Sequence, residues 1–293
     1  MTAPLRDTLG AVRTDRDVVE VAGPDAASYL QGQCSQDVEA LAEGASAWTF
    51  VLQPDGKVAV WGRVTRVAPD RFVLDVDPGA GPALITRLER FKLRVDAAVT
   101  PLDWTVLAVR GPGATEIDTG DALAVDPEWP GVEGIDLLGP APRAPAGVPT
   151  GDAADLEALR IEAGVPAMGH ELTEQTIPAE AGVVERSVSF TKGCYTGQEL
   201  TARIDSRGGN VPRHLRGIVV DGVEPPAPGS EVVVDGEVVG TVTTAARSAH
   251  LQAAVALAYV KRSIDPPAAA VVRGEGGERA GEVRALPLVG VPG

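Results

Sequence analysis

The sequence predicts an α+β protein that carries a small β-barrel at its C-terminal end. Signals for hairpins and helices are mixed along the first 212 residues, as in α+β proteins. After Pro212 the pattern changes to short alternating strands without an evident helix, which favours a barrel for residues 213–293. A chain of 293 residues also exceeds what one hydrophobic core usually organises. We therefore expect one domain at 1–212, with subdomains of roughly 1–100 and 101–212, and a second at 213–293.

Strands and helices are expected to alternate in the first subdomain. Pro24, after Gly23, is suited to the first turn of a helix. The Asp55-Gly56 pair is typical of the tight turn of a β-hairpin. On these grounds the expected elements are strands at 17–21, 47–52, 58–64 and 71–76, and helices at 26–30 and about 83–92.

The rest of the chain continues this mixture and then becomes all-β. A strand at 104–110 ends at Gly111-Pro112, a junction similar to the one at Gly23-Pro24, and this indicates a weakly marked internal duplication. Residues 140–149, rich in Pro, Ala and Gly, are expected to form a connecting loop. The remaining expected elements are a helix capped by Asp152 or Asp155 and ended at Gly164, a hairpin around Asp235-Gly236, and strands at 253–260 and 268–272.

The composition argues against several classes of function. The formal net charge is −15 and the pI is near 4.6, so nonspecific attraction to nucleic acid or to an anionic membrane is disfavoured. No apolar run approaches the ~20 residues of a membrane span, and the first residues lack the apolar core of a signal peptide. We expect a cytoplasmic protein without nucleic-acid or membrane partners. Two cysteines and three histidines give little support for disulfides or for a metal site built by this chain alone.

Cys194 is the first candidate functional residue, because it lies in the segment Lys192 to Glu199 just before an expected helix. Thr196 and Glu199 have the spacing of a capping box, which predicts that the helix runs through Ile204. The helix dipole and Lys192 would then favour the thiolate form of Cys194. The alternative is a small buried cysteine that only packs.

Glu162 is the second candidate. It is expected in the last turn of the helix ended by Gly164, where the helix dipole disfavours an anion. A carboxylate held there could accept two parallel N–H donors from the amino-pyrimidine part of a pterin or purine. The alternative is an ordinary solvated glutamate.

Five segments in a fixed order carry a family resemblance. They are Gln31 to Gln33 with Asp37, Gly56-Lys57, Arg90 to Arg94, Arg160 to Gly164, and Ser189 to Glu199. Together they resemble the YgfZ family of folate-binding proteins, which is related to the T-protein (aminomethyltransferase) of the glycine cleavage system and to a mitochondrial iron-sulfur assembly factor. The resemblance covers most of the chain, and the octapeptide around Cys194 is its most specific part.

The resemblance implies two interlocked ferredoxin-like subdomains and a C-terminal barrel around a central folate cavity. It implies a protein that binds tetrahydrofolate, or a one-carbon derivative of it, and supports iron-sulfur cluster assembly or repair through client or assembly proteins. By position, Glu162 matches the carboxylate that holds the pterin, and Leu156 matches a pocket position where relatives can carry tryptophan. Cys194 matches the motif cysteine, whose loop Lys192, Gln198 and Glu199 would hold.

One departure from the transferase relatives bears on catalysis. T-proteins carry an aspartate shortly after the glycine of the equivalent hairpin, where this chain has Ala59 or Val60. Neither side chain can move a proton or stabilise a developing positive charge. The leading interpretation is therefore a non-hydrolytic, folate-dependent accessory protein in iron-sulfur maintenance. An aminomethyl or methyl transferase and a partner-docking module with a vestigial cavity stay open as alternatives.

Two further sets of residues have weaker claims. Arg203 and Arg207 are four apart on one helix face. They could attract the glutamate tail of a folate or a partner's acidic surface, or pair with Glu199 or Asp205. Cys34 is expected to be a packing residue, because nothing near it in the sequence would lower its pKa.

Overall fold

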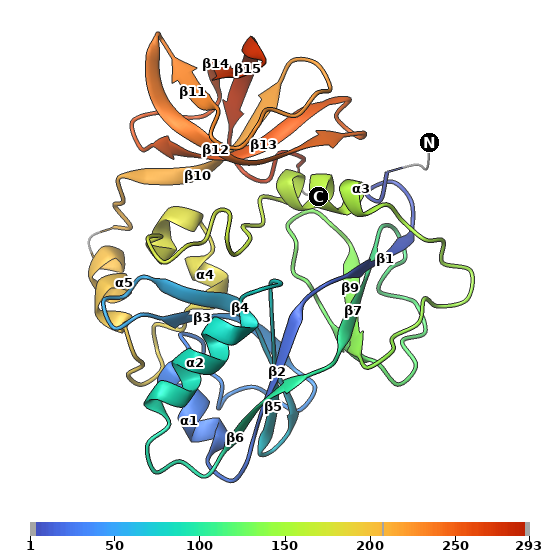
Figure 1. The fold of residues 1–293 in the computed structure, drawn as a ribbon, viewed down its shortest axis with the longest axis vertical. Coiled ribbons are helices and arrows are strands. Elements are labelled where there is room, and N and C mark those ends of the chain that lie inside the picture. Colours follow the sequence, from blue (N-terminus) through green and yellow to red (C-terminus); the bar gives the residue numbers. More distant parts are fainter. Residues whose placement is uncertain (1–3, 207, 291–293) are drawn as a thin grey trace.

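The computed structural model describes residues 4–206 and 208–290. Two antiparallel sheets lie beneath a C-terminal barrel, and helix α3 (Ala153–Ala163) lies between the barrel and one of these sheets (Figure 1). We call the sheet with strand order β3-β4-β5-β2-β6 the first sheet, and the sheet with order β1-β7-β9-β8 the second sheet. The α+β class with a terminal barrel is confirmed.

The first sheet is covered on one face by two helices. Its apolar core joins Leu30 of one helix and Leu84 and Leu88 of the other to Val60 and Val64 of the sheet. The elements are β2 (Asp17–Ala22), α1 (Ala26–Gln33), β3 (Ser46–Leu52), β4 (Val58–Ala68), β5 (Arg71–Val76), α2 (Gly81–Phe91) and β6 (Ala98–Leu102). Each strand and helix expected in this region is confirmed, with ends shifted by a few residues.

The second sheet shows that the two halves are interlocked. It combines the N-terminal strand β1 (Gly10–Thr14) with β7 (Thr105–Arg110), β8 (Leu123–Val125) and β9 (Gly134–Gly139). The chain thus leaves the second sheet after β1, builds the first sheet, and returns after β6. Because β1–β2 and β6–β7 are short connections, the two sheets are held close together.

Strand alternation gives the first sheet a second, polar face. Successive side chains of a strand point to opposite faces, so Val60 and Val64 of β4 face the helices while Trp61 and Arg63 face away from them. Arg63 is 1% exposed and bonds to Asp136 of β9. The region between the two sheets therefore contains aromatic and charged side chains as well as aliphatic ones.

Helix α3 is positioned by both of its ends. The Asp152 carboxylate accepts a hydrogen bond from Ala154 N, and Gly164 adopts the left-handed conformation with φ of 73° that favours glycine at a helix end. The helix packs against β12 and β13 of the barrel and against β1. The predicted cap and the predicted end of this helix are confirmed.

The segment after α3 contains only short helices. They are the 3₁₀ helix η1 (Pro178–Ala181), α4 (Val184–Ser187) and α5 (Gln198–Asp205). Helix α5 has Gly197, with φ of 82°, as its N-cap and no side-chain capping bond there. The predicted capping box of Thr196 and Glu199 is wrong, because a glycine, not a hydroxyl side chain, precedes the helix.

The barrel closes in the order β10-β13-β12-β11-β14-β15. Its strands are β10 (Arg213–Val220), β11 (Glu231–Val234), β12 (Glu237–Ser248), β13 (Ala253–Lys261), β14 (Ala268–Gly274) and β15 (Gly277–Arg284). The hairpin turn has Asp235 and Gly236 at φ of 51° and 81°, as a type I′ turn requires. The buried Glu171 accepts hydrogen bonds from Thr243 and Thr244 of β12, which joins the barrel to the rest of the chain.

Candidate functional site

A cavity of about 380 Å³ lies between the two sheets and helix α3. Its wall includes β1 and the β1–β2 junction, β3, β4, β7, β9, the loop before β9, and the first two turns of α3. This volume falls within the ~300–1,000 Å³ range of small-molecule sites. The cavity is the part of the described structure that best combines apolar walls with convergent charged groups.

Three tryptophans line the cavity. Trp48 and Trp61 stack on each other with ring centroids 4.0 Å apart. Their indole nitrogens are fixed, because Trp48 donates to the Pro127 carbonyl and Trp61 to the Ser187 hydroxyl. Trp129 comes from the loop before β9 and is half-buried. An aromatic wall of this kind suits a flat organic ring.

A buried network of arginines and aspartates forms the base of the cavity. Arg63 donates two hydrogen bonds to Asp75 and a third, of 2.7 Å, to Asp136. Arg110 lies 2.8 Å from Asp136, and Arg16 bonds to Asp75 at 2.6 Å. Burial acts to raise the pKa of Asp75, but Arg63 and Arg16 outweigh it and the pKa is lowered. Each charge is thus paired, as burial requires.

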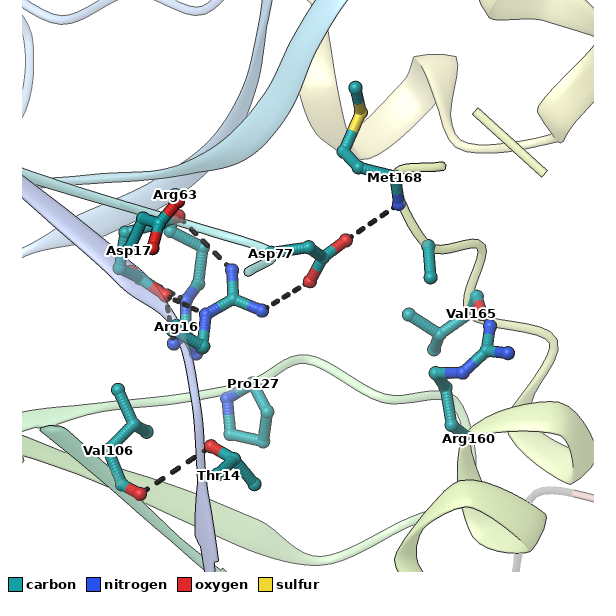
Figure 2. Close-up of polar contacts among 12 residues, drawn as sticks. Thr14, Arg16, Asp17, Arg63, Asp77, Val106, Pro127, Arg160, Val165 and Met168 are labelled. Carbon is teal, nitrogen blue, oxygen red and sulfur yellow. Dashed lines mark hydrogen bonds and ion pairs between the residues drawn. The ribbon is translucent and has the colours of Figure 1, made fainter. Parts of the chain in front are cut away.

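Asp77 extends this network towards the segment after α3. One carboxylate oxygen accepts a hydrogen bond from Arg16 at 2.7 Å, and the other accepts the Met168 backbone N–H at 2.8 Å. Figure 2 shows Arg16 pointing toward Asp77 and Asp77 reaching Met168. The β1–β2 junction, the first sheet and the chain after α3 are therefore tied together at the cavity wall.

Asp136 makes the stability of the protein depend on pH. Burial acts to raise its pKa, but Arg110 and Arg63 outweigh burial and lower the pKa from 3.8 to about 2. A carboxyl group with a lowered pKa in the folded state stabilises the protein above its unfolded pKa and loses this effect as the pH falls to the folded value. Between about pH 4 and pH 2 we expect Asp136 to remove on the order of 2 kcal/mol from the free energy of unfolding. Urea unfolding from pH 5 to pH 2 measures this, and Asp136→Asn should flatten the curve.

The structure places the two residues of α3 that were predicted to bind folate in different surroundings. Leu156 lines the cavity. Glu162 does not line this cavity and is buried on the side of α3 that faces the barrel. There Arg6 Nε donates to Glu162 Oε2 at 2.8 Å, and Ser248 Oγ donates to Glu162 Oε1 at 2.6 Å. Because Glu162 is 2% exposed, the alternative of an ordinary solvated glutamate is wrong. Its binding of a pterin stays a prediction.

Two residues of α3 that the sequence did not single out do line the cavity. Glu157 and Arg160 lie one turn apart beside Leu156, as spacing on one helix face requires. Arg160 donates to both Glu157 oxygens, and also to Glu171 and to Thr244 of the barrel. Helical periodicity counted from Leu156 could have identified both residues, because Glu162 falls on another face.

The motif cysteine lies outside the cavity. Cys194 is exposed. Its loop packs against the turn of the β3–β4 hairpin: the contact between Gly197 and Gln53 is so close that a Cβ at Gly197 would lie 2.3 Å from the Gln53 carbonyl oxygen. Trp48 of the cavity wall is five residues before Gln53 on that strand, roughly 16 Å away. The structure therefore does not place Cys194 among the cavity residues. By contrast Cys34 is fully buried, and burial raises its pKa to about 11, which confirms it as a packing residue.

Lys192 holds the loop that carries Cys194. Among the described contacts, none joins its ammonium group to the Cys194 thiol. Its ammonium group donates to the backbone carbonyls of Gln31, Cys34 and Gln36 at 2.6 to 2.9 Å. These carbonyls lie at and just after the C-terminal end of α1, where a cation is favoured. Burial lowers the pKa of Lys192. Gln198 adds a bond from Tyr195 N to its side-chain oxygen.

Removing the ammonium group should loosen this loop. Lys192→Met would leave three carbonyls without their shared donor, at a cost of roughly 1–3 kcal/mol. We expect faster hydrogen exchange at Ser189 and Thr196, whose N–H groups bond to Ser35 O and Gly32 O. Lys57→Met, on the half-exposed hairpin lysine, is the matched control. Equal exchange in both variants would refute the role of Lys192.

The other predicted residues stay apart from the cavity. Arg203 is exposed on α5 and forms no ion pair with another described residue, so the expected pairs with Glu199 or Asp205 are absent there. Its proposed partner Arg207 lies outside the described residues. Ala59 and Val60 are buried in β4, so this part of the strand carries no carboxyl group.

Among residues 4–206 and 208–290, no group of three or more His, Cys, Asp or Glu side chains is arranged to hold a metal ion. Within the same residues, no helix has the length and apolar character needed to cross a membrane.

Two protein-family models match this chain, one in its N-terminal part and one in its C-terminal part. Residues 15–119 match the GCVT N-terminal domain, and residues 213–289 match the glycine cleavage T-protein C-terminal barrel domain. The crystal structure of the glycine cleavage system aminomethyltransferase T from Bartonella henselae has a similar fold. Its TM-score is 0.79 at 21% identity, over 98% of this chain and 88% of that chain.

Sequence relatives agree with this fold. An uncharacterised protein of Haemophilus influenzae is 32% identical over 67% of this chain and 69% of its own length. An aminomethyltransferase of Streptomyces avermitilis is 28% identical over 92% of this chain and 83% of its length. The mitochondrial iron-sulfur cluster assembly factor IBA57 homolog of Mycosarcoma maydis is 29% identical over 66% of this chain and 53% of its length. The chain therefore belongs to the family of glycine cleavage T-protein-like proteins, to which the predicted YgfZ family is related.

Proposed function

We propose that this protein binds tetrahydrofolate in the central cavity and supports the assembly or repair of iron-sulfur clusters through Cys194. The observation that carries the proposal is the combination of an aromatic, charged cavity with Ala59 and Val60 in β4. The cavity keeps the properties of a ligand site. The strand lacks the acid that group transfer in the transferase relatives would use.

The cavity wall fits the polar edge of a pterin. Arg110 Nε has no hydrogen-bond partner among the described residues, and the ion pair with Arg110 Nη1, at 2.8 Å, is the contact that holds Asp136 Oδ1. A pterin presents N–H donors and a carbonyl acceptor along its amino-pyrimidine edge, which an aspartate and an arginine can satisfy. Arg110, Asp136 and Leu156 would hold the ligand, and the tryptophans would form the apolar wall around it. The bound folate would supply the one-carbon carrier chemistry.

The proposed role in iron-sulfur metabolism rests on Cys194 and on one relative. A relative of this chain is named as an iron-sulfur cluster assembly factor. The thiol lies on a loop that Lys192 and Gln198 hold in place, with Phe190 49% exposed on the same loop. An accessible thiol on an ordered loop can meet the surface of a client or assembly protein, and the cluster is then the cargo.

A second candidate is an aminomethyl or methyl transferase. It is favoured by the four carboxylates that line the cavity, Asp15, Asp77, Asp136 and Glu157, and by the transferase relatives. Three of them, however, are already engaged: Asp77 by Arg16 and Met168 N, Asp136 by Arg63 and Arg110, and Glu157 by Arg160. Asp15 is exposed at the β1–β2 junction. An acid held in an ion pair moves a proton less readily. A docking module with a vestigial cavity is the third candidate.

Calorimetry and one assay separate the three. The proposal predicts heat from tetrahydrofolate binding, and no 5,10-methylene-tetrahydrofolate above background when a methylamine donor is added. Formation of that product would favour the transferase. Absence of binding heat would leave only the docking module and would refute the proposed folate site.

A further inference from the structure

The three tryptophans of the cavity differ in how much of each ring is free. Trp48 and Trp61 are 4% and 1% exposed, whereas Trp129 is half-buried. A flat ligand can stack only on a ring with accessible surface. The amount of exposed ring therefore decides which tryptophan can meet the ligand.

Trp48 and Trp61 are occupied by contacts within the protein. They stack on each other at 4.0 Å with an interplanar angle of 17°. Arg63 lies over Trp48 at 5.4 Å, and Arg186 lies 5.3 Å and 5.1 Å from the centroids of the two rings. These rings form a rigid part of the wall and have almost no accessible surface.

Trp129 is held in place and is only half-buried. Arg110, which is 2% exposed, lies over its ring at 4.5 Å from the centroid. The ring also packs against the apolar cluster that contains Val12 and Leu156. The backbone carbonyl of Trp129 accepts the Val132 N–H. A ring fixed in this way loses little entropy when a ligand stacks on it.

The second sheet provides the space that Arg110 needs. Gly134 lies opposite Arg110 in the β7–β9 pair, and a Cβ at Gly134 would lie 2.7 Å from Arg110 Cδ. The glycine thus lets the arginine side chain lie across β9 toward Trp129. The sequence contains this device, but only the strand register reveals it.

We propose that Trp129 is the residue on which the flat ring of the cavity's ligand stacks, with Arg110 holding the tryptophan in position. The proposal rests on the proposed function, because it takes the ligand to be a reduced folate. It assigns the ring-binding role to the loop before β9. Stacking of a heteroaromatic ring on an aromatic side chain typically changes affinity by about tenfold or more.

Footprinting of the unaltered protein tests the contact directly. Hydroxyl-radical oxidation followed by peptide mass spectrometry reports how accessible each tryptophan is. Saturating tetrahydrofolate should reduce oxidation of Trp129 several-fold and leave Trp104 unchanged, because Trp104 lines an adjoining outer groove and not the cavity. Binding measured by calorimetry without protection of Trp129 would overturn the proposal and leave the folate site itself standing.

Variants give a second, independent test. We expect Trp129→Leu to raise the Kd for tetrahydrofolate at least about tenfold and Trp129→Phe to raise it less than about threefold. Trp104→Leu is the matched control and should leave Kd unchanged. The tail-free ligand 6-methyltetrahydropterin should lose the same factor in Trp129→Leu. Loss for the folate alone would show that Trp129 meets the tail and would overturn ring stacking. No binding by the unaltered protein would refute the proposed function and this inference together.

Discussion

Replacing Cys194 by serine is expected to abolish the support of iron-sulfur enzymes in cells while folding and tetrahydrofolate binding stay unchanged. Cys194 is exposed, so the substitution removes no core packing. Its loop is held by Lys192 and Gln198 through bonds that do not involve the sulfur. Serine keeps the shape of the side chain but is a far weaker nucleophile and metal ligand than a thiolate. Only chemistry at the sulfur should be lost.

The measurement is complementation of cells that lack this protein, scored by the activity of a cluster-dependent enzyme. Cys34→Ala is the matched control, because it removes the other thiol from inside the core. It should cost some stability but keep activity if the protein accumulates normally. Full restoration by Cys194→Ser would reject the role of the thiol.

The largest expected effect on stability comes from Asp75. Asp75 is 0% exposed and accepts one hydrogen bond from Arg16 Nε and two from Arg63. Asp75→Asn removes the negative charge but leaves the two arginines in place. Breaking a buried ion pair in this way typically costs about 3–5 kcal/mol, because the remaining charge is buried without compensation.

Urea unfolding at pH 7 measures this loss, and Asp77→Asn is a matched control. Asp77 also pairs with Arg16, but its side chain is 18% exposed against 0% for Asp75. We expect it to cost less than half as much, since water can solvate the remaining partner. Equal losses in the two variants would contradict the view that burial sets the cost.

The strong local signals predicted much of the fold. The Asp55-Gly56 and Asp235-Gly236 turns, the helix cap at Asp152 and the helix end at Gly164 depend on a few neighbouring residues, and each appears where expected. These features need no knowledge of the rest of the chain, because their physical causes lie within one turn.

Features that depend on distant pairing were missed. Strand β1 has five residues and finds its partner in β7, almost a hundred positions away. Strand β9 joins the sheet through that same partner, β7. A pattern within a single segment does not reveal such a partner. The capping box of Thr196 failed for a related reason, since Gly197 is required by close contact with Gln53 of the β3–β4 hairpin.

The candidate site was predicted only in part. Leu156, which the family resemblance indicated, lines the cavity, and its contact with a folate stays a prediction. The network of Arg63, Asp75 and Asp136 went unnoticed, because these charges come from three strands in two sheets. In sequence they look like ordinary surface residues. Glu162 was singled out by its position against the helix dipole, and the structure provides Arg6 and Ser248 as its partners.

The most direct test of the account is a crystal structure of the protein with tetrahydrofolate. We expect the ring inside the cavity between the two sheets, in contact with Trp129 and near Arg110 and Asp136, with Cys194 outside and free of the ligand. A folate bound in another part of the molecule, or a cavity that stays without ligand at saturating concentration, would contradict it.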